Sequence, residues 1–156
     1  ALLPISKEDV VRGKYLFVCL IELCSALLMT LIAVLRMTVF ADSPVYRENA
    51  LMNANGFALG TAFVLFGLFN AIFVGGFFRT VYRIGKPFII YIVVNFVVIA
   101  VAEALHHFPG LSALNAFGTD AFGLQMGLLI LGMSIYVVLT YISFRKSCSR
   151  LERIDL

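Results

Sequence analysis

Four long apolar segments constrain the fold of this chain more than any other feature of its sequence. They run over residues 15–40, 56–78, 88–108 and 121–144. A helix that crosses a bilayer needs about 20 mostly apolar residues, whereas a strand of a membrane barrel needs only about 10. We therefore expect an all-α fold, a polytopic membrane protein with a bundle of four transmembrane helices.

The composition agrees with a membrane protein and leaves no room for a second domain. Hydrophobic residues make up 62% of the 156 positions and charged residues 13%, whereas soluble domains have about 45–50% and 25%. We expect one transmembrane domain over residues 1–156. Its three cysteines, Cys19, Cys24 and Cys148, lack the paired spacing of a disulfide framework and indicate free thiols.

The positions of lysine and arginine predict the orientation of the bundle. Ten of the twelve basic residues precede the first apolar segment, separate the second from the third, or follow the fourth. Basic residues accumulate on the cytoplasmic side of membrane proteins. We therefore expect a multi-pass protein of the cell membrane with both ends of the chain, including the tail 145–156, in the cytoplasm.

The segment before the first apolar run, residues 4–14, predicts a short amphipathic cytoplasmic helix. Ser6 and Asp9 have the spacing of a capping box, which starts a helix. Glu8 and Asp9 then lie in the first turn, where the helix dipole favours acidic residues. Two interpretations stay open: an interfacial helix held on anionic headgroups by its basic residues, or a docking element for a partner.

Small residues in the spans predict close helix packing. Gly56 and Gly60 form one GxxxG motif, and Gly123 and Gly127 form another. Such notches let two helices approach closely in lipid. The motifs fit packing within the chain, with a homodimer seam as the alternative.

Polar groups inside the spans are candidates for function because they are costly in a membrane. On helical spacing, one stripe of the first span carries Glu22, Ser25, Met29, Ala33 and Arg36, and it should face protein or water. The stripe fits either side chains that snorkel or pair with other helices, or the lining of a translocation path. Asn70 and Asn95 are further path candidates, or hydrogen-bond donors between helices.

The end of the third span carries Glu103, His106 and His107 in the pattern E-x-x-H-H. A carboxylate and imidazoles are ligands for a metal ion. The sequence offers no second cluster that completes a ligand set, and an interfacial hydrogen-bonded pair is the other interpretation. We expect no metal in this chain, with these three residues as a weak candidate.

Several catalytic and binding motifs are absent from the sequence. It lacks a G-x-x-x-x-G-K-[ST] phosphate loop, a G-x-S-x-G motif and a recognisable Ser/His/Asp set. It also lacks aromatic platforms for stacking on nucleic acid. We expect neither nucleic-acid binding nor catalysis by this chain.

The two ends of the chain resemble a known family. LPISKEDVVRGKYL, from Leu3 to Leu16, is similar to a cytoplasmic segment of bacterial ABC transporter permeases of the type-2 exporter class. YISFRKSCSRLERIDL, from Tyr141 to Leu156, looks like the end of the same proteins. Such permeases have six spans, two of them before the LP motif. The resemblance thus implies a fragment that lacks two spans, or a four-span relative.

The resemblance implies a permease that moves substrate out of the cell while a separate ATP-binding cassette subunit hydrolyses ATP with Mg²⁺. The permease itself holds no cofactor and pairs with a second permease as a homodimer or heterodimer in membrane lipid. Its coupling residues would be Ser6, Lys7, Glu8, Asp9 and Arg12. Two alternatives stay open: a scaffold or immunity-type membrane protein, and a small metal-binding membrane enzyme.

Overall fold

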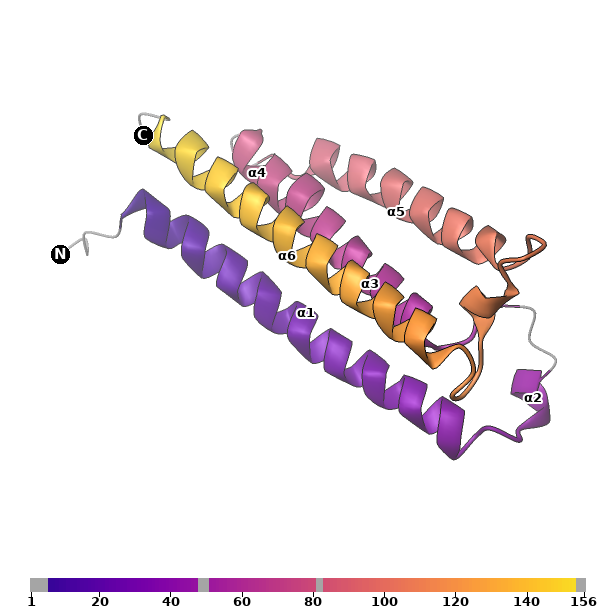
Figure 1. The fold of residues 1–156 in the computed structure, drawn as a ribbon. Helices are drawn as coiled ribbons and strands as arrows, with labels where there is room; N and C mark the ends of the chain where they lie inside the picture. Colours follow the sequence, from indigo (N-terminus) through magenta and orange to yellow (C-terminus); the bar gives the residue numbers. More distant parts are fainter. Residues whose placement is uncertain (1–5, 48–50, 81–82, 154–156) are drawn as a thin grey trace.

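The computed structural model describes residues 6–47, 51–80 and 83–153, and the described part is built from helices and their connections (Figure 1). Within these ranges, four helical stretches are long and apolar enough to cross a membrane: Lys7–Thr38, Gly56–Arg79, Gly85–Leu105 and Phe122–Glu152. The expected all-α membrane fold is therefore confirmed. The helix α2 (Pro44–Arg47) and the 3-10 helix η2 (Ser112–Asn115) lie in connections.

The first long helix, α1 (Lys7–Thr38), is continuous. The described part of the segment predicted as a separate short helix forms its first turns, and the span predicted over 15–40 follows without a break. Gly13 is the weakest helix former near this junction, and its cost of about 1 kcal/mol is small. Val11 and Tyr15, on either side of it, are buried against other helices and hold the junction in helical form.

The second spanning stretch changes its winding halfway. It consists of α3 (Gly56–Leu68), a π-helical segment η1 (Phe69–Val74) and α4 (Gly75–Arg79). Asn55 caps its start, because its side chain accepts a hydrogen bond from the backbone of Ala58. Short π-helical insertions are rare overall, and those that occur are often found at functional sites.

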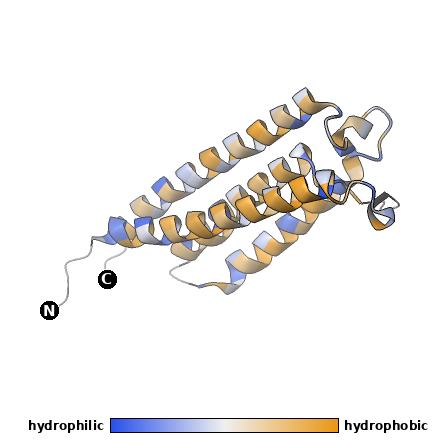
Figure 2. Ribbon diagram, turned by 90° about the horizontal axis from the view of Figure 1, so that it is seen from below, coloured by the Kyte–Doolittle hydropathy of each residue, from blue (hydrophilic) through white to orange (hydrophobic). Residues whose placement is uncertain are grey.

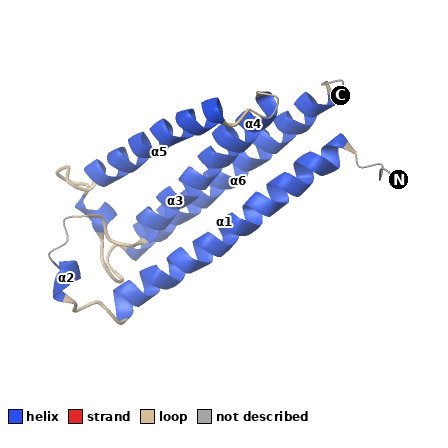
Figure 3. Cartoon of the chain, turned by 180° about the vertical axis from the view of Figure 1, so that it is seen from behind, coloured by secondary structure: helices blue, strands red, loops and turns tan. Residues whose placement is uncertain are grey.

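The four spans alternate in direction, so the start of α1 and the end of α6 (Phe122–Glu152) lie at one end of the bundle (Figure 1). We call this the terminal end. The connections that contain α2 and η2 lie at the opposite end, which we call the loop end (Figure 3). The last helix extends past the predicted limit of residue 144, because Ser147 and Leu151 still pack inward.

The helices α3 and α6 form the centre of the bundle. They make the most extensive contact in the structure, α1 packs against both of them, and α5 (Gly85–Leu105) packs against α3 and η1. Hydrophobic residues line most of the length of the helices (Figure 2). Many of these side chains are exposed on the outer surfaces, and so large an apolar surface favours contact with lipid over contact with water.

Candidate functional site

A set of polar side chains is buried where α1, η1 and α6 meet. Nδ2 of Asn70 donates hydrogen bonds to Glu22 Oε2 at 3.0 Å and to Thr140 Oγ1 at 2.9 Å. The hydroxyl of Tyr136 donates to the same Glu22 oxygen at 2.9 Å. Asn70 is fully buried and Glu22 is only 6% exposed. Three elements are thus joined by polar contacts in the apolar part of the bundle.

The hydrogen bonds continue toward the terminal end. Ser143 donates its hydroxyl to the backbone oxygen of Asn70 at 2.7 Å. The hydroxyl of Tyr15 lies 2.7 Å from Ser143 Oγ and 3.1 Å from Ser147 Oγ. We call the complete set the buried polar cluster; its members are Tyr15, Glu22, Asn70, Tyr136, Thr140, Ser143 and Ser147.

Two acceptor atoms in this cluster have no hydrogen-bond partner within the described residues. They are Oε1 of Glu22 and Oδ1 of Asn70. Buried polar atoms are almost always paired, and the exceptions call for an explanation such as a proton, an ion or a polar ligand. The cluster is therefore both a link between helices and a place with unused binding capacity.

The other predicted path residues form hydrogen bonds with groups outside this cluster. Ser25 donates to the backbone oxygen of Ile21 within its own helix. Arg36 lies near the loop end, where its guanidinium donates to the Phe40 backbone and stacks 4.9 Å from the Phe117 ring. Asn95 accepts a hydrogen bond from Tyr91 on its own helix, α5.

The inward-facing stripe of α1 also differs from the predicted one. Glu22 and Ala33 are buried, but the stripe passes through Ala26, which is 7% exposed, while Met29 is 38% exposed. Steps of seven, four and seven residues separate Tyr15, Glu22, Ala26 and Ala33. Such steps keep side chains on one face of a helix.

The first two turns of α1 carry an exposed charged face. The predicted helix start is confirmed: Ser6 is the N-cap, and its Oγ accepts from the Asp9 backbone at 3.1 Å and donates to the Asp9 carboxylate at 2.6 Å. Arg12 and Glu8 form an exposed ion pair at 3.2 Å. Val11, fully buried, fixes the opposite face of the same turns. We call Ser6, Glu8, Asp9 and Arg12 the N-terminal charged face; Lys7, predicted with them, is half-buried.

A cavity of about 620 Å³ opens at the terminal end. Apolar residues of η1, α5 and α6 form its wall. Four basic residues also line it, and they are Arg79, Lys86, Lys146 and Arg150. Positive charge is thus concentrated at the end of the bundle where α1 begins.

The four predicted packing glycines divide into two pairs. A Cβ on Gly56 or Gly60 would collide with the α6 backbone at Gln125 or Leu128. These two glycines therefore permit the close contact between α3 and α6. A Cβ on Gly123 or Gly127 would meet nothing within 4 Å among the described residues.

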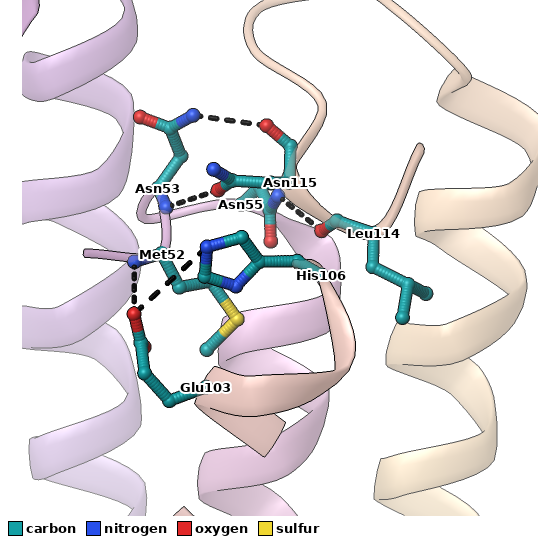
Figure 4. A network of polar contacts seen from close by, with 7 residues as sticks. All are labelled: Met52, Asn53, Asn55, Glu103, His106, Leu114 and Asn115. Atoms are coloured by element: carbon teal, nitrogen blue, oxygen red, sulfur yellow. Dashed lines mark hydrogen bonds and ion pairs between the residues drawn. The ribbon is translucent and has the colours of Figure 1, made fainter. Parts of the chain in front are cut away.

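A second polar network fastens the connections at the loop end (Figure 4). Asn53 donates two hydrogen bonds to Asn115, from its backbone to Oδ1 and from Nδ2 to the backbone oxygen, and Asn55 donates to the backbone oxygens of Leu114 and Ala116. Glu103 accepts from the Met52 backbone at 2.9 Å. Glu103, His106 and His107, predicted from the E-x-x-H-H pattern, do lie together, with one potential ligand atom of each within 4.8 Å of the others.

These observations define a polytopic helical membrane protein with a buried polar cluster and a charged helix end, which is typical of the membrane component of a transporter. The family model described as "ABC-2 family transporter protein" matches residues 1–151. The chain belongs to the ABC-2 transporter family. No curated protein and no solved structure gives a significant match. Family membership identifies a transport component that is generally not catalytic and implies association with an ATP-binding cassette subunit.

Proposed function

We propose that this chain is the permease of an ATP-driven exporter and that the N-terminal charged face docks on the separate ATP-binding subunit. The observation that carries the proposal is the continuity of α1. Glu8 and Asp9 lie on the same unbroken helix as Glu22, about 20 Å further along at 1.5 Å per residue. A force applied to the charged face is therefore transmitted directly to the buried polar cluster.

Within the membrane, Glu22 and Asn70 are the residues we propose for the translocation path. Each has an acceptor atom without a partner in the described part of the chain, and Asn70 lies in the π-helical segment, whose winding differs from that of its neighbours. Because three elements meet at this junction, its polar side chains can exchange hydrogen-bond partners when the helices shift. Ser25, Arg36 and Asn95 form hydrogen bonds with groups outside this junction and stay weaker candidates.

We also propose that the terminal end lies on the cytoplasmic side of the membrane. The basic residues around the cavity there would face the anionic cytoplasmic surface, as the positive-inside rule requires. Two permease copies, identical or related, would form the complete membrane domain. The exposed Gly123 and Gly127 of α6 leave a notch for such a neighbour.

The docking proposal is tested by co-purification of the chain with the ATP-binding subunit of its transporter. The double variant Glu8→Arg/Arg12→Glu keeps the ion pair within α1 but reverses the pattern presented to a partner. We expect it to lose most of the bound subunit and the transport-dependent part of ATP hydrolysis. Asp120→Lys, a charge reversal at an exposed site near the loop end, is the control and should leave both unchanged.

The outcomes separate the proposal from its alternative. Unchanged binding and transport in the double variant would remove the docking role of the charged face. If the unmodified chain associates with no ATP-binding subunit at all, a scaffold or immunity-type function becomes the better account.

A further inference from the structure

His106, at the end of α5, is buried without hydrogen bonds. It is 8% exposed, and neither ring nitrogen has a hydrogen-bond partner within the described residues. The nearest carboxylate oxygen, Glu103 Oε1, lies 4.0 Å from Nε2, which is too far for a hydrogen bond. A neutral imidazole always carries one donor and one acceptor, and burying both unpaired is costly. The described protein atoms therefore leave His106 without the partners that a buried imidazole needs.

The groups around His106 are metal ligands. Glu103 and His107 each bring a ligand atom within 4.8 Å of one on His106. The two imidazole rings lie with their centroids 3.9 Å apart. Bonds of about 2.0–2.2 Å to a tetrahedral zinc ion place ligand atoms about 3.4 Å from one another. His107 is exposed, so rotation of its side chain is the adjustment that brings the ligand atoms closer.

The surroundings hold the carboxylate in place. Glu103 Oε1 accepts a hydrogen bond from the backbone of Met52, and the same oxygen is the one that lies 4.0 Å from His106 Nε2 (Figure 4). A carboxylate oxygen has a second lone pair, which is left for a ligand. Met52 adjoins Asn53, which is itself fixed to Asn115. Hydrogen bonds that orient a ligand from outside are a regular part of metal sites.

We propose that Glu103, His106 and His107 bind a Zn²⁺ ion at the loop end of the bundle. Two imidazoles and one carboxylate suit zinc, whereas Mg²⁺ and Ca²⁺ prefer sites made of oxygen ligands alone. The fourth position is left to water. The ion satisfies one nitrogen of His106 and joins it to Glu103, which already accepts a hydrogen bond from Met52 in the segment that leads into α3. This inference does not depend on the proposed transport function.

The test uses the untagged chain in detergent, freed of metal with a chelator and titrated with zinc chloride by calorimetry. We expect one zinc ion per chain and a higher unfolding temperature with zinc but not with magnesium. X-ray absorption at the zinc edge should show two imidazoles. His107→Ala and Glu103→Gln should each lower the zinc affinity about tenfold or more, since even the loss of an outer-shell partner has that effect.

The two variants are chosen to keep the fold. His107 is exposed, and the amide oxygen of Glu103→Gln still accepts from the Met52 backbone. Asp120→Asn, an exposed acidic residue of the same end, is the control and should bind zinc like the unmodified chain. The proposal is overturned if the unmodified chain binds no stoichiometric zinc, or if both variants bind it equally well.

Discussion

The amide of Asn70 lies 3.0 Å from the carboxylate of Glu22, although 48 residues separate the two positions in the chain. One comes from α1 and the other from the π-helical segment of the second span. Their contact joins the helix that begins at the N-terminal charged face to the centre of the bundle. The permease mechanism proposed above depends on this contact.

Removing the Glu22 carboxylate should destabilise the bundle. Glu22→Ala leaves the Tyr136 hydroxyl and one proton of the Asn70 amide without an acceptor. A buried donor left unpaired costs about 1–3 kcal/mol, so we expect a clear fall in unfolding temperature in detergent. Glu22→Gln keeps an acceptor oxygen of similar position and should fall less. Equal losses in the two variants would show that the hydrogen bonds contribute little.

The hydroxyl of Tyr15 should contribute separately from its ring. Tyr15→Phe removes the hydrogen bonds to Ser143 and Ser147 but keeps the contacts of the ring with Phe78 and Phe144. We expect a loss of about 0.5–1.5 kcal/mol, the usual net value of an internal hydrogen bond. Tyr141→Phe is the matched control, because Tyr141 is 61% exposed on the same helix as the two serines. A loss of the same size in the control would contradict the assignment.

The existence and number of the spans were predictable from the sequence. A long apolar segment in lipid must pair its own backbone groups, and a helix is the structure that does so within one segment. The start of α1 was predictable too, since Ser6 and Asp9 are only three residues apart and determine the cap locally. The proximity of Glu103, His106 and His107 follows from helical spacing in the same way.

The buried polar cluster was predictable only in part. Tyr136, Thr140, Ser143 and Ser147 are spaced by four, three and four residues, so they share one face of α6, and this polar stripe is visible in the sequence. Its partners are not, because the choice between Asn70 and Asn95 depends on how the spans pack. The π-helical winding of Phe69–Val74 likewise has no local signal that we identify.

The two pairs of glycines should respond oppositely to alanine. In Gly60→Ala the new Cβ lies 2.6 Å from the Leu128 backbone oxygen, so α3 and α6 must separate. We expect a cost of about 1–3 kcal/mol, as for other overpacked contacts. Gly127→Ala has open space around it and gains about 1 kcal/mol of helix propensity. Thermal unfolding of the two variants in detergent compares them directly, and a larger loss in Gly127→Ala would contradict the observed packing.

Gln125 holds the loop end together from the first turn of α6. It is 5% exposed; its Oε1 accepts from the Phe57 backbone at 2.7 Å, and its Nε2 donates to the backbone oxygens of Ala113 and Leu114. Gln125→Leu removes both interactions, so the amide proton of Phe57 should exchange with solvent faster, and the bundle should lose about 1–3 kcal/mol. Gln125→Glu keeps an acceptor for Phe57 but loses the donor. This variant should therefore keep the Phe57 amide protected while the segment around Ala113 becomes looser. Hydrogen exchange measured residue by residue distinguishes these two effects. Equal exchange at Phe57 in both variants would show that Gln125 does not hold this helix start.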